Sequence, residues 1–364
     1  AVLDETSKLH AGDEQNLKLW EQFLPHCKDE INRIYSRLNV RFDHTLGESF
    51  YQPMLGDVVA DLKTRGLATE SDGAICIFMD QFDSPMIIQK SDGAFLYATT
   101  DLATLRYRQE EFAPDEILYV VDARQSEHFD KLFAVAETVG LDRAKLVHVS
   151  FGTVLGEDGR PIKTRSGTLI GLESLLDDAV EAAHKVVCNP DRLVKLDPPM
   201  DDAEQRLVSE RIGIGAIKYA DLSHDRTSDY RFNLSKMVAL SGNTSTYAQY
   251  SYARTTSILR RNGVSEQEVI DRVAETGISL THPSERELGL KLLQFEEALQ
   301  SVYDDYGPNH LVDYVYSTAE SFSRFNENCH VLNAEVGQQQ NTRLALVALT
   351  SRVIRKALEL IGIQ

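Results

Sequence analysis

The sequence contains no apolar run that approaches the ~20 residues of a membrane-spanning helix. Its first five residues, Ala-Val-Leu-Asp-Glu, do not form a basic and apolar leader. We therefore expect neither a membrane span nor a secretion signal. Cysteine is also scarce, with four in 364 residues and no CxxC pair. This scarcity disfavours a zinc site and a disulfide-stapled extracellular fold, and it favours a reducing cytoplasm.

Basic residues are fewer than acidic residues in this sequence. The sequence has 38 Lys and Arg against 56 Asp and Glu, a formal net charge of -18. A protein that coats nucleic acid nonspecifically draws most of its affinity from Lys and Arg that neutralise phosphates, so this class is disfavoured. Residues 247–364 hold 11 basic and 15 acidic side chains, a net of -4, which leaves -14 for residues 1–246. A local basic patch remains compatible with the C-terminal third.

The remaining composition, 42% hydrophobic and 26% charged, is that of a globular protein. At roughly 150 residues per domain, the length predicts two or three domains. Short apolar runs predict strands buried on both faces at residues 94–98, 116–121 and 145–150. Helical patterns at residues 101–111 and 126–139 lie between them, the first with Thr99 and Thr100 as candidate N-caps and the second closed by Gly140. This alternation predicts a parallel α/β sheet.

Other segments follow less regular patterns. A helix over residues 12–38 and a hairpin of residues 73–78 and 85–89 are expected before the sheet. Helices at residues 172–188 and 202–220 flank a connector, Asp197-Pro198-Pro199. From Tyr247 onward the apolar spacing is helical, and one face is predicted to carry Leu288, Leu292, Phe295, Leu299 and Val302. The C-terminal third therefore reads as an α-helical bundle.

Three polar clusters follow the predicted strands, where open parallel sheets bind their ligands. Tyr97 and Asp101 place a phenol and a carboxylate four residues apart. Gln125 is suited to hydrogen-bond a ligand, and His128 to pair with a phosphate or another side chain. Structural interpretations stay open, because an acid is favoured in the first turn of a helix and an aromatic residue often belongs to the core.

The third cluster is the glycine-flanked loop at residues 156–167. It carries Lys163, Thr164, Arg165 and Ser166, a cationic and hydroxyl-bearing sequence suited to a triphosphate. The same composition is typical of a solvated charged loop. Taken together, the clusters predict an anion site on this loop and a cationic or polar ligand near Asp101.

Six ordered stretches of the sequence resemble the arginyl-tRNA synthetase family, which belongs to the class I aminoacyl-tRNA synthetases. The matching stretches are Gly47–Tyr51, Tyr97–Ala103, Asp122–Gln125 with His128-Phe129, Ile162–Gly167, Gly213–Tyr219 and Gly242–Tyr250. The resemblance implies a partial Rossmann-type, parallel-sheet catalytic domain at residues 1–172, connecting helices that contact the tRNA stem at 173–240, and an α-helical anticodon-binding domain at 241–364.

The resemblance also implies an activity. ATP-dependent activation of L-arginine would give arginyl-adenylate, and the arginyl group would pass to the 3'-terminal adenosine of tRNA(Arg). ATP is then a substrate with Mg²⁺, and neither a permanent cofactor nor a metal site built from side chains is expected. The partners are L-arginine, ATP and tRNA(Arg), for a cytoplasmic monomer that does not bind membranes.

Roles for individual residues follow from the same resemblance. Tyr97, Asp101 and Gln125 take the positions that recognise the arginine side chain, and a carboxylate with neutral acceptors suits a planar guanidinium. His128 and the loop residues Lys163, Thr164, Arg165 and Ser166 are assigned to ATP and the adenylate. That loop takes the place of the class I Lys-Met-Ser-Lys-Ser signature but reads Ile-Lys-Thr-Arg-Ser. Because the second lysine is absent, the roles of Lys163 and Arg165 are not separated.

The segment from Tyr247 to Gly263 has no acidic residue. It carries a mixture of aromatic and basic side chains suited to base stacking and phosphate contacts. The candidate tRNA-binding residues are Tyr247, Tyr250, Arg254, Arg260 and Arg261. A solvated helix face is the alternative interpretation.

No counterpart of the family's N-terminal domain or its His-Ile-Gly-His type signature occurs in this sequence, so we expect a fragment that is inactive alone. An alternative function is a noncatalytic tRNA-binding or regulatory module derived from the same family. The intact Tyr97, Asp101, Gln125 and Lys163 argue against it, since such a module needs no arginine pocket. An unrelated nucleotidyltransferase would not explain the match at Gly242–Tyr250.

Overall fold

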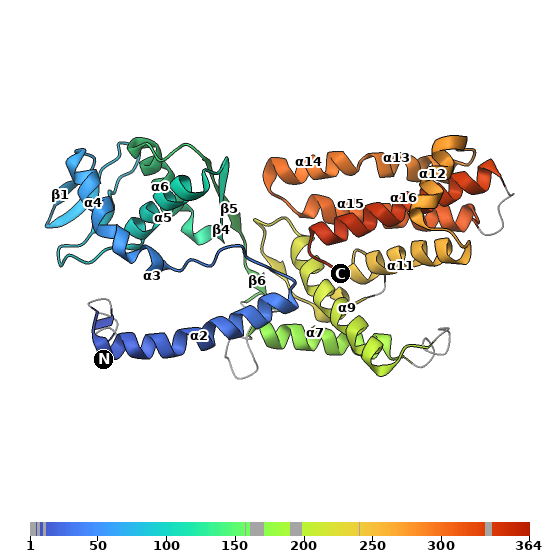
Figure 1. The fold of residues 1–364 in the computed structure, drawn as a ribbon, viewed down its shortest axis with the longest axis horizontal. Coiled ribbons are helices and arrows are strands. Elements are labelled where there is room, and N and C mark those ends of the chain that lie inside the picture. The colour runs from blue at the N-terminus through green and yellow to red at the C-terminus, as the bar shows by residue number, and fades with distance from the viewer. Residues whose placement is uncertain are drawn as a thin grey trace. The chain divides into compact units, whose positions relative to one another are not determined.

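The computed structural model describes residues 5, 8–9, 12–156, 158–160, 171–189, 199–239, 241–331 and 337–364. It is mainly helical, with three small sheets, and its backbone divides into two compact units (Figure 1). The smaller unit comprises residues 42–153 and 226–230, and the larger comprises residues 1–41, 154–225 and 231–364.

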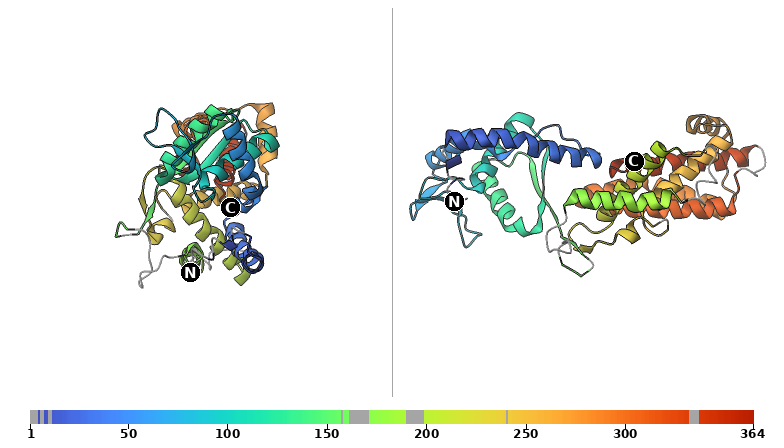
Figure 2. Two further views of the ribbon diagram at one scale, coloured as in Figure 1. Left: turned by 90° about the vertical axis from the view of Figure 1, so that its left-hand side faces the viewer. Right: turned by 90° about the horizontal axis from the view of Figure 1, so that it is seen from below.

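The smaller unit is built around two parallel strands, β4 (Glu116–Asp122) and β5 (Lys145–Phe151), paired in register from Glu116 opposite Lys145 to Asp122 opposite Phe151. Helix α6 (Ser126–Val139) connects them and ends at Gly140, which adopts φ +77°. Both strands, their parallel pairing and this helix confirm the sequence predictions. Helix α5 (Tyr97–Phe112) precedes β4, and α5 and α6 lie on the same side of the two strands (Figures 1 and 2).

One face of β4 is exposed, contrary to the expectation of strands buried on both faces. Ile117 and Tyr119 are buried, whereas Leu118 and Val120 are 43% and 66% exposed. Successive side chains of a strand point to opposite faces, and among the described residues only the face toward α5 and α6 is covered. The continuous apolar run of β4 is therefore buried on one face of the strand only, among the described residues.

The strand predicted at residues 94–98 is wrong. Phe95 makes only a single antiparallel bridge, with Gln89, and α5 already begins at Tyr97. Thr99 and Thr100, expected as N-caps, lie inside the first turn, where their N–H groups donate to the Leu96 carbonyl. The Thr99 hydroxyl donates to the Ile88 carbonyl instead. A short apolar run does not distinguish a strand from the first turn of a buried helix.

The other elements of the smaller unit form an antiparallel sheet and short helices. The predicted hairpin is confirmed as β2 (Ala74–Ile77) and β3 (Met86–Gln89), and a third strand, β1 (Thr69–Ser71), was not predicted. The remaining elements are α3 (Glu48–Tyr51), η1 (Gln52–Met54), α4 (Leu55–Thr64) and η2 (Ala123–Gln125). The core of this unit includes the fully buried Leu62, Leu102, Leu105 and Leu132.

The first part of the larger unit consists of helices with two short strands. The predicted helices are confirmed as α2 (Glu14–Arg37), α7 (Leu172–Val187) and α9 (Asp202–Leu222), and the other elements are β6 (Val154–Leu155), β7 (Tyr230–Arg231) and α10 (Leu234–Met237). Helices α7 and α9 approach closely at Gly213, where an added Cβ would lie 2.6 Å from the Val180 Cα. The first two residues of the predicted connector, Asp197 and Pro198, lie outside the described residues.

The C-terminal part is helical throughout its described residues, as predicted. Its helices are α11 (Ser245–Arg261), α12 (Glu266–Thr276), α13 (Pro283–Leu293), α14 (Phe295–Asp305), α15 (Asn309–Asn328) and α16 (Gln338–Leu360). The predicted single face from Leu288 to Val302 is divided between α13 and α14, because the chain leaves the helix at Gln294. Leu288 packs in one core with Phe322, and Val302 in another with Val312.

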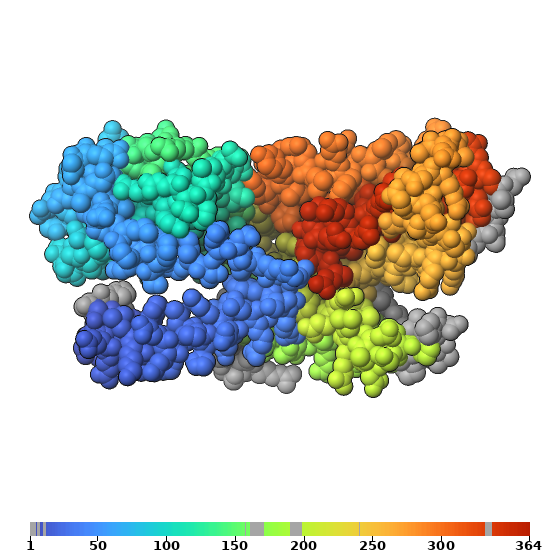
Figure 3. Space-filling model, viewed as in Figure 1, coloured from blue at the N-terminus to red at the C-terminus, as the bar shows by residue number. Residues whose placement is uncertain are grey.

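The last residues pack back onto α9. In Figure 3 they form a dark red patch beside the yellow-green surface of that helix. The ammonium of Lys218 donates to the carbonyls of Leu38 and Gly362 at 2.5 and 2.7 Å. Gln249 donates to the carbonyl of Gln364 at 2.7 Å. Among the described helices of either unit, none combines the length and apolar character needed to cross a membrane.

Candidate functional site

The beginning of α5 presents two of the predicted arginine-binding residues. Tyr97 is the first residue of the helix and is 72% exposed. Asp101 follows one turn later, so both side chains lie on the same face of α5, and its carboxylate is partly buried. A phenol and a carboxylate placed in this way can flank a planar cationic ligand.

His128 contacts Asp101 directly. Its Nε2 lies 2.7 Å from Asp101 Oδ2, so an N–H at this nitrogen donates to the carboxylate. The imidazole also packs edge-on against Phe129, with 5.2 Å between ring centres. The sequence analysis gave His128 a phosphate or another side chain as its partner and, by resemblance, assigned it to ATP and the adenylate. The structure shows a side-chain partner, Asp101. Within the described part of the chain, no hydrogen bond links this pair to Tyr97 or Gln125.

Gln125 ends the short helix η2, directly before α6, and is exposed. The start of η2 is fixed by Asp122, which accepts from the backbone N–H of Arg124 and from its guanidinium Nε and Nη2, each at 2.8 Å. The side-chain hydrogen bonds from Arg124, followed by the backbone N–H, lower the pKa of Asp122 to about 2. Asp122 is therefore already paired with Arg124 and is not available to a ligand. Gln125 remains as the ligand candidate of this cluster.

Tyr119 is a neighbour that the sequence analysis missed. This β4 side chain is 8% exposed, and its hydroxyl has no hydrogen-bond partner among the described residues. Burial raises the pKa of Tyr119 to about 12, and the Asp101 charge acts in the same direction while Arg108 opposes it. The phenol is therefore a buried neutral group, and the Arg108 guanidinium carbon lies 5.6 Å from the centre of its ring. A tyrosine within the most apolar strand was its only sequence signal.

The predicted anion site has no described geometry. Lys163, Thr164, Arg165 and Ser166 all lie outside the described residues. Among the residues that the structure does describe, no cluster of three or more His, Cys, Asp or Glu is arranged to hold a metal ion.

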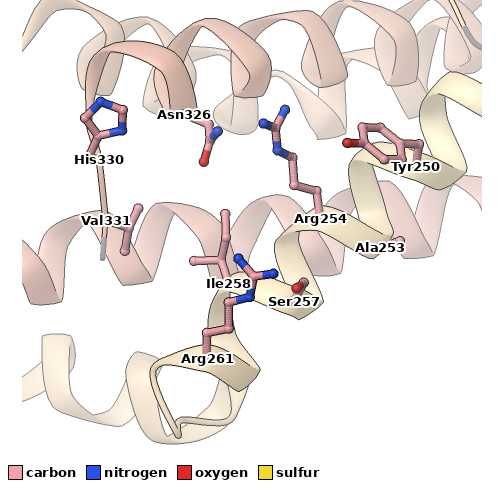
Figure 4. A pocket seen from close by; sticks show the side chains of 9 residues that line it. All are labelled: Tyr250, Ala253, Arg254, Ser257, Ile258, Arg261, Asn326, His330 and Val331. Carbon is pink, nitrogen blue, oxygen red and sulfur yellow. The ribbon is translucent and has the colours of Figure 1, made fainter. Parts of the chain in front are cut away.

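The candidate tRNA-binding residues of α11 divide into three environments. Tyr247 packs into the helical core, with its ring centre 5.8 Å from that of Tyr316. Tyr250, Arg254 and Arg261 line a cavity between α11 and the end of α15 (Figure 4). Arg260, although adjacent to Arg261, lines a different recess that also contains Glu266. The five residues therefore do not form one continuous surface.

Family models match most of the chain. Residues 4–234 match the catalytic domain of the class I (R) tRNA synthetases, and residues 248–364 match the DALR anticodon-binding domain. The arginine–tRNA ligase of Rhodopirellula baltica is 64% identical over 100% of this chain, and that of Chromobacterium violaceum is 43% identical over 99%. The chain spans 55% and 62% of the lengths of these two relatives.

A solved structure supports the same grouping. The crystal structure of arginyl-tRNA synthetase from Plasmodium falciparum superposes with a TM-score of 0.84 at 31% sequence identity. The match covers 99% of this chain and 60% of that one. The parallel sheet and the helical bundle therefore have the architecture of that enzyme.

Proposed function

The chain belongs to the class I arginyl-tRNA synthetase family, and from that premise we propose that it forms part of an arginine–tRNA ligase. The reaction is the activation of L-arginine with ATP, followed by transfer of the arginyl group to the 3'-terminal adenosine of tRNA(Arg). The chain contributes the arginine side-chain site and the anticodon-binding bundle. The division into a catalytic part at residues 1–172, connecting helices at 173–240 and the bundle at 241–364 belongs to this proposal.

The observation that carries the proposal is the state of Asp101. Its carboxylate is partly buried, and among the described residues no Lys or Arg forms an ion pair with it. The His128 imidazole holds Oδ2 at 2.7 Å, which leaves Oδ1 to accept from a guanidinium. A hydrogen bond to a charged group contributes about 1.5 to 3 kcal/mol, enough to select arginine over a neutral side chain. Tyr97 and Gln125 supply the surrounding polar groups.

In this proposal His128 is a positioning residue. It orients the Asp101 carboxylate rather than contacting ATP. The nucleotide is assigned to Lys163, Thr164, Arg165 and Ser166, whose resemblance to the class I signature loop supports the assignment. Magnesium would neutralise phosphate charge while the arginine carboxylate attacks the α-phosphate and pyrophosphate leaves.

The proposed tRNA-binding residues are Tyr247, Tyr250, Arg254, Arg260 and Arg261. All five lie on α11, which the matched anticodon-binding domain includes from residue 248 onward. A monomeric state and a cytoplasmic location also remain proposals. The four cysteines, all described and all free, are compatible with a reducing compartment. Sedimentation of the purified chain tests the oligomeric state.

A chimera tests the proposed activity. This chain replaces the corresponding 55% of the Rhodopirellula baltica ligase, and total tRNA is charged with each of the twenty amino acids. The chain alone is assayed in parallel. We expect the chimera to charge arginine only. If the folded chimera binds tRNA and ATP but charges nothing, the noncatalytic tRNA-binding module becomes the better interpretation.

A further inference from the structure

The C-terminal end of α7 places a cysteine beside a histidine. Cys188 is the C-cap of this helix, and His184 lies four residues earlier, so the two side chains share one face. The thiol sulfur lies 3.4 Å from His184 Nδ1 and 3.5 Å from Nε2. A thiol next to an imidazole base is the arrangement that activates a cysteine as a nucleophile. Neither residue belongs to the proposed arginine, nucleotide or tRNA sites.

The neighbouring helix α9 fixes the imidazole. The Ser209 hydroxyl is fully buried and donates to the backbone carbonyl of Gln205 at 2.6 Å. Because a hydroxyl has a single proton, the Ser209 oxygen accepts from His184 Nδ1, which lies 3.1 Å away. This network assigns the N–H of the neutral imidazole to Nδ1. Nε2 therefore keeps the lone pair with which it accepts the thiol proton.

The Cys188 thiol is partly exposed and has a second neighbour. It donates to the side-chain oxygen of Gln205 at 3.0 Å. The Gln205 amide nitrogen donates in turn to the Met200 carbonyl at 3.0 Å, which holds this side chain in place. The thiol proton thus has two acceptors beside it, and its transfer to His184 gives a thiolate next to an imidazolium. A thiolate is the reactive form of a cysteine.

The other three cysteines lack this arrangement in the described part of the chain. Cys76 and Cys329 are buried, and burial raises the pKa of both thiols. Cys27 is exposed on α2 and directly follows His26. Adjacent positions on a helix do not face each other, so His26 does not offer the contact that His184 offers. The chain therefore contains its own comparison, an exposed thiol without a base.

We propose that Cys188 is a redox modification site that forms a mixed disulfide with a small disulfide of the glutathione class. His184 Nε2 takes the thiol proton, and the thiolate attacks one sulfur of the small disulfide. A new sulfur–sulfur bond forms at Cys188 while the original one breaks, and the second sulfur leaves as a thiolate that takes the proton from His184. The modified sulfur carries no proton, so the hydrogen bond to Gln205 is lost. Transient disulfides of this kind act as redox sensors in reducing compartments.

Mapping the modification on the full 364-residue chain tests the proposal. The reduced chain is incubated with oxidised glutathione, and its peptides are followed over time by mass spectrometry. We expect the Cys188 peptide to gain the glutathionyl mass at least about tenfold faster than the peptide of Cys27, although Cys27 is the more exposed thiol. Dithiothreitol should reverse the gain in both peptides.

Variants identify the base. His184→Ala, at an exposed position, should slow modification of Cys188 at least about tenfold and leave Cys27 unchanged. His26→Ala is the matched control and should change neither rate. Ser209→Ala keeps the imidazole but removes the acceptor for Nδ1, so the Cys188 rate should fall about threefold. Cys188→Ser should remove the fast reaction and leave the slow one at Cys27.

Three results would overturn the proposal: modification of Cys27 at least as fast as that of Cys188, an unchanged Cys188 rate in His184→Ala, or a ratio of the two rates that persists in urea. In urea the contact with His184 is lost, and the ratio should approach about one, since free thiols share one ordinary pKa. Thermal unfolding of each variant excludes loss of folding as the cause. The readout involves neither tRNA nor arginine, so its outcome is independent of the proposed ligase activity.

Discussion

Asp101 accepts one hydrogen bond from His128 and forms no ion pair with a described Lys or Arg. Because its charge is not needed by another side chain, we expect a substitution of Asp101 to affect only the binding of arginine. In the chimera, Asp101→Asn removes the charge that pairs with the guanidinium. We expect the KM for arginine to rise at least tenfold, a step of about 1.4 kcal/mol, with the KM for ATP nearly unchanged. Glu111→Gln, an exposed residue of the same helix, is the control. An equal rise in both KM values would show that the pocket is misplaced.

His128 allows a separate prediction, because its contact orients Asp101 rather than the ligand. His128→Ala should raise the KM for arginine about three- to tenfold while kcat at saturating arginine is retained. His128→Gln keeps an N–H donor and should recover part of the loss. A change confined to the KM for ATP would instead return His128 to the nucleotide.

Glu285 joins two elements of the bundle. This carboxylate is fully buried at the N-terminus of α13, where it accepts from the backbone N–H groups of Thr281 and His282 at 2.8 and 3.0 Å. On its other side it accepts from Arg343 of α16 at 2.7 Å. Glu285→Gln leaves the partly buried Arg343 without its charge partner, so we expect a loss of about 3 kcal/mol in the free energy of unfolding by urea. Glu297→Gln, exposed on α14, should change little.

The same carboxylate predicts a pH dependence. Burial alone raises the pKa of Glu285, but the hydrogen bonds from the His282 backbone, from Arg343 and from Thr281 outweigh it, and the net pKa is lowered. A folded-state pKa below the unfolded value of about 4.3 stabilises the protein above that pH, and this contribution is lost as the pH falls through the folded pKa. The stability difference between wild type and Glu285→Gln should therefore shrink below about pH 4.

The elements that the sequence predicted best are those with strong boundary signals. Gly140 ends α6, and the apolar runs of β4 and β5 are flanked by helical patterns. The strand prediction at residues 94–98 failed because a short apolar run is compatible with a strand and also with the start of a buried helix. Residues 94–98 are apolar enough for a strand, yet α5 begins at Tyr97. The Leu96 carbonyl accepts the hydrogen bonds of its first turn, from the N–H groups of Thr99 and Thr100.

The sites show a similar limit. Tyr97, Asp101 and Gln125 could be proposed as a polar cluster from their positions along the chain, which is a local signal, and their role in arginine binding follows from the family resemblance and stays a prediction. The contact between His128 and Asp101, and the placement of Asn326 and His330 opposite Arg254, depend on tertiary packing across 27 or more residues of chain. Helical periodicity alone also did not show that Arg260 and Arg261 line different recesses.

Each of the two units has its own buried core, and this predicts localised effects of core mutations. Leu105→Ala in the smaller unit and Ile354→Ala in the larger unit each remove a fully buried side chain. Each should cost about 2 to 5 kcal/mol. Hydrogen exchange should accelerate mainly within residues 42–153 for the first variant and mainly within the bundle for the second. Uniform acceleration in both units would indicate a single cooperative fold.

The Lys218 ammonium, which donates to carbonyls of Leu38 and Gly362, has a practical consequence for labelling. Burial lowers the pKa of this lysine, and the two carbonyls are its described acceptors. Deleting residues 362–364 would remove one of them and free space beside α9. An affinity tag or fluorophore fused there would disturb a packed junction that includes the end of α2. In the Cys188→Ser variant, dyes are better attached at Cys27, which is exposed and lies on α2 about three helical turns before Leu38.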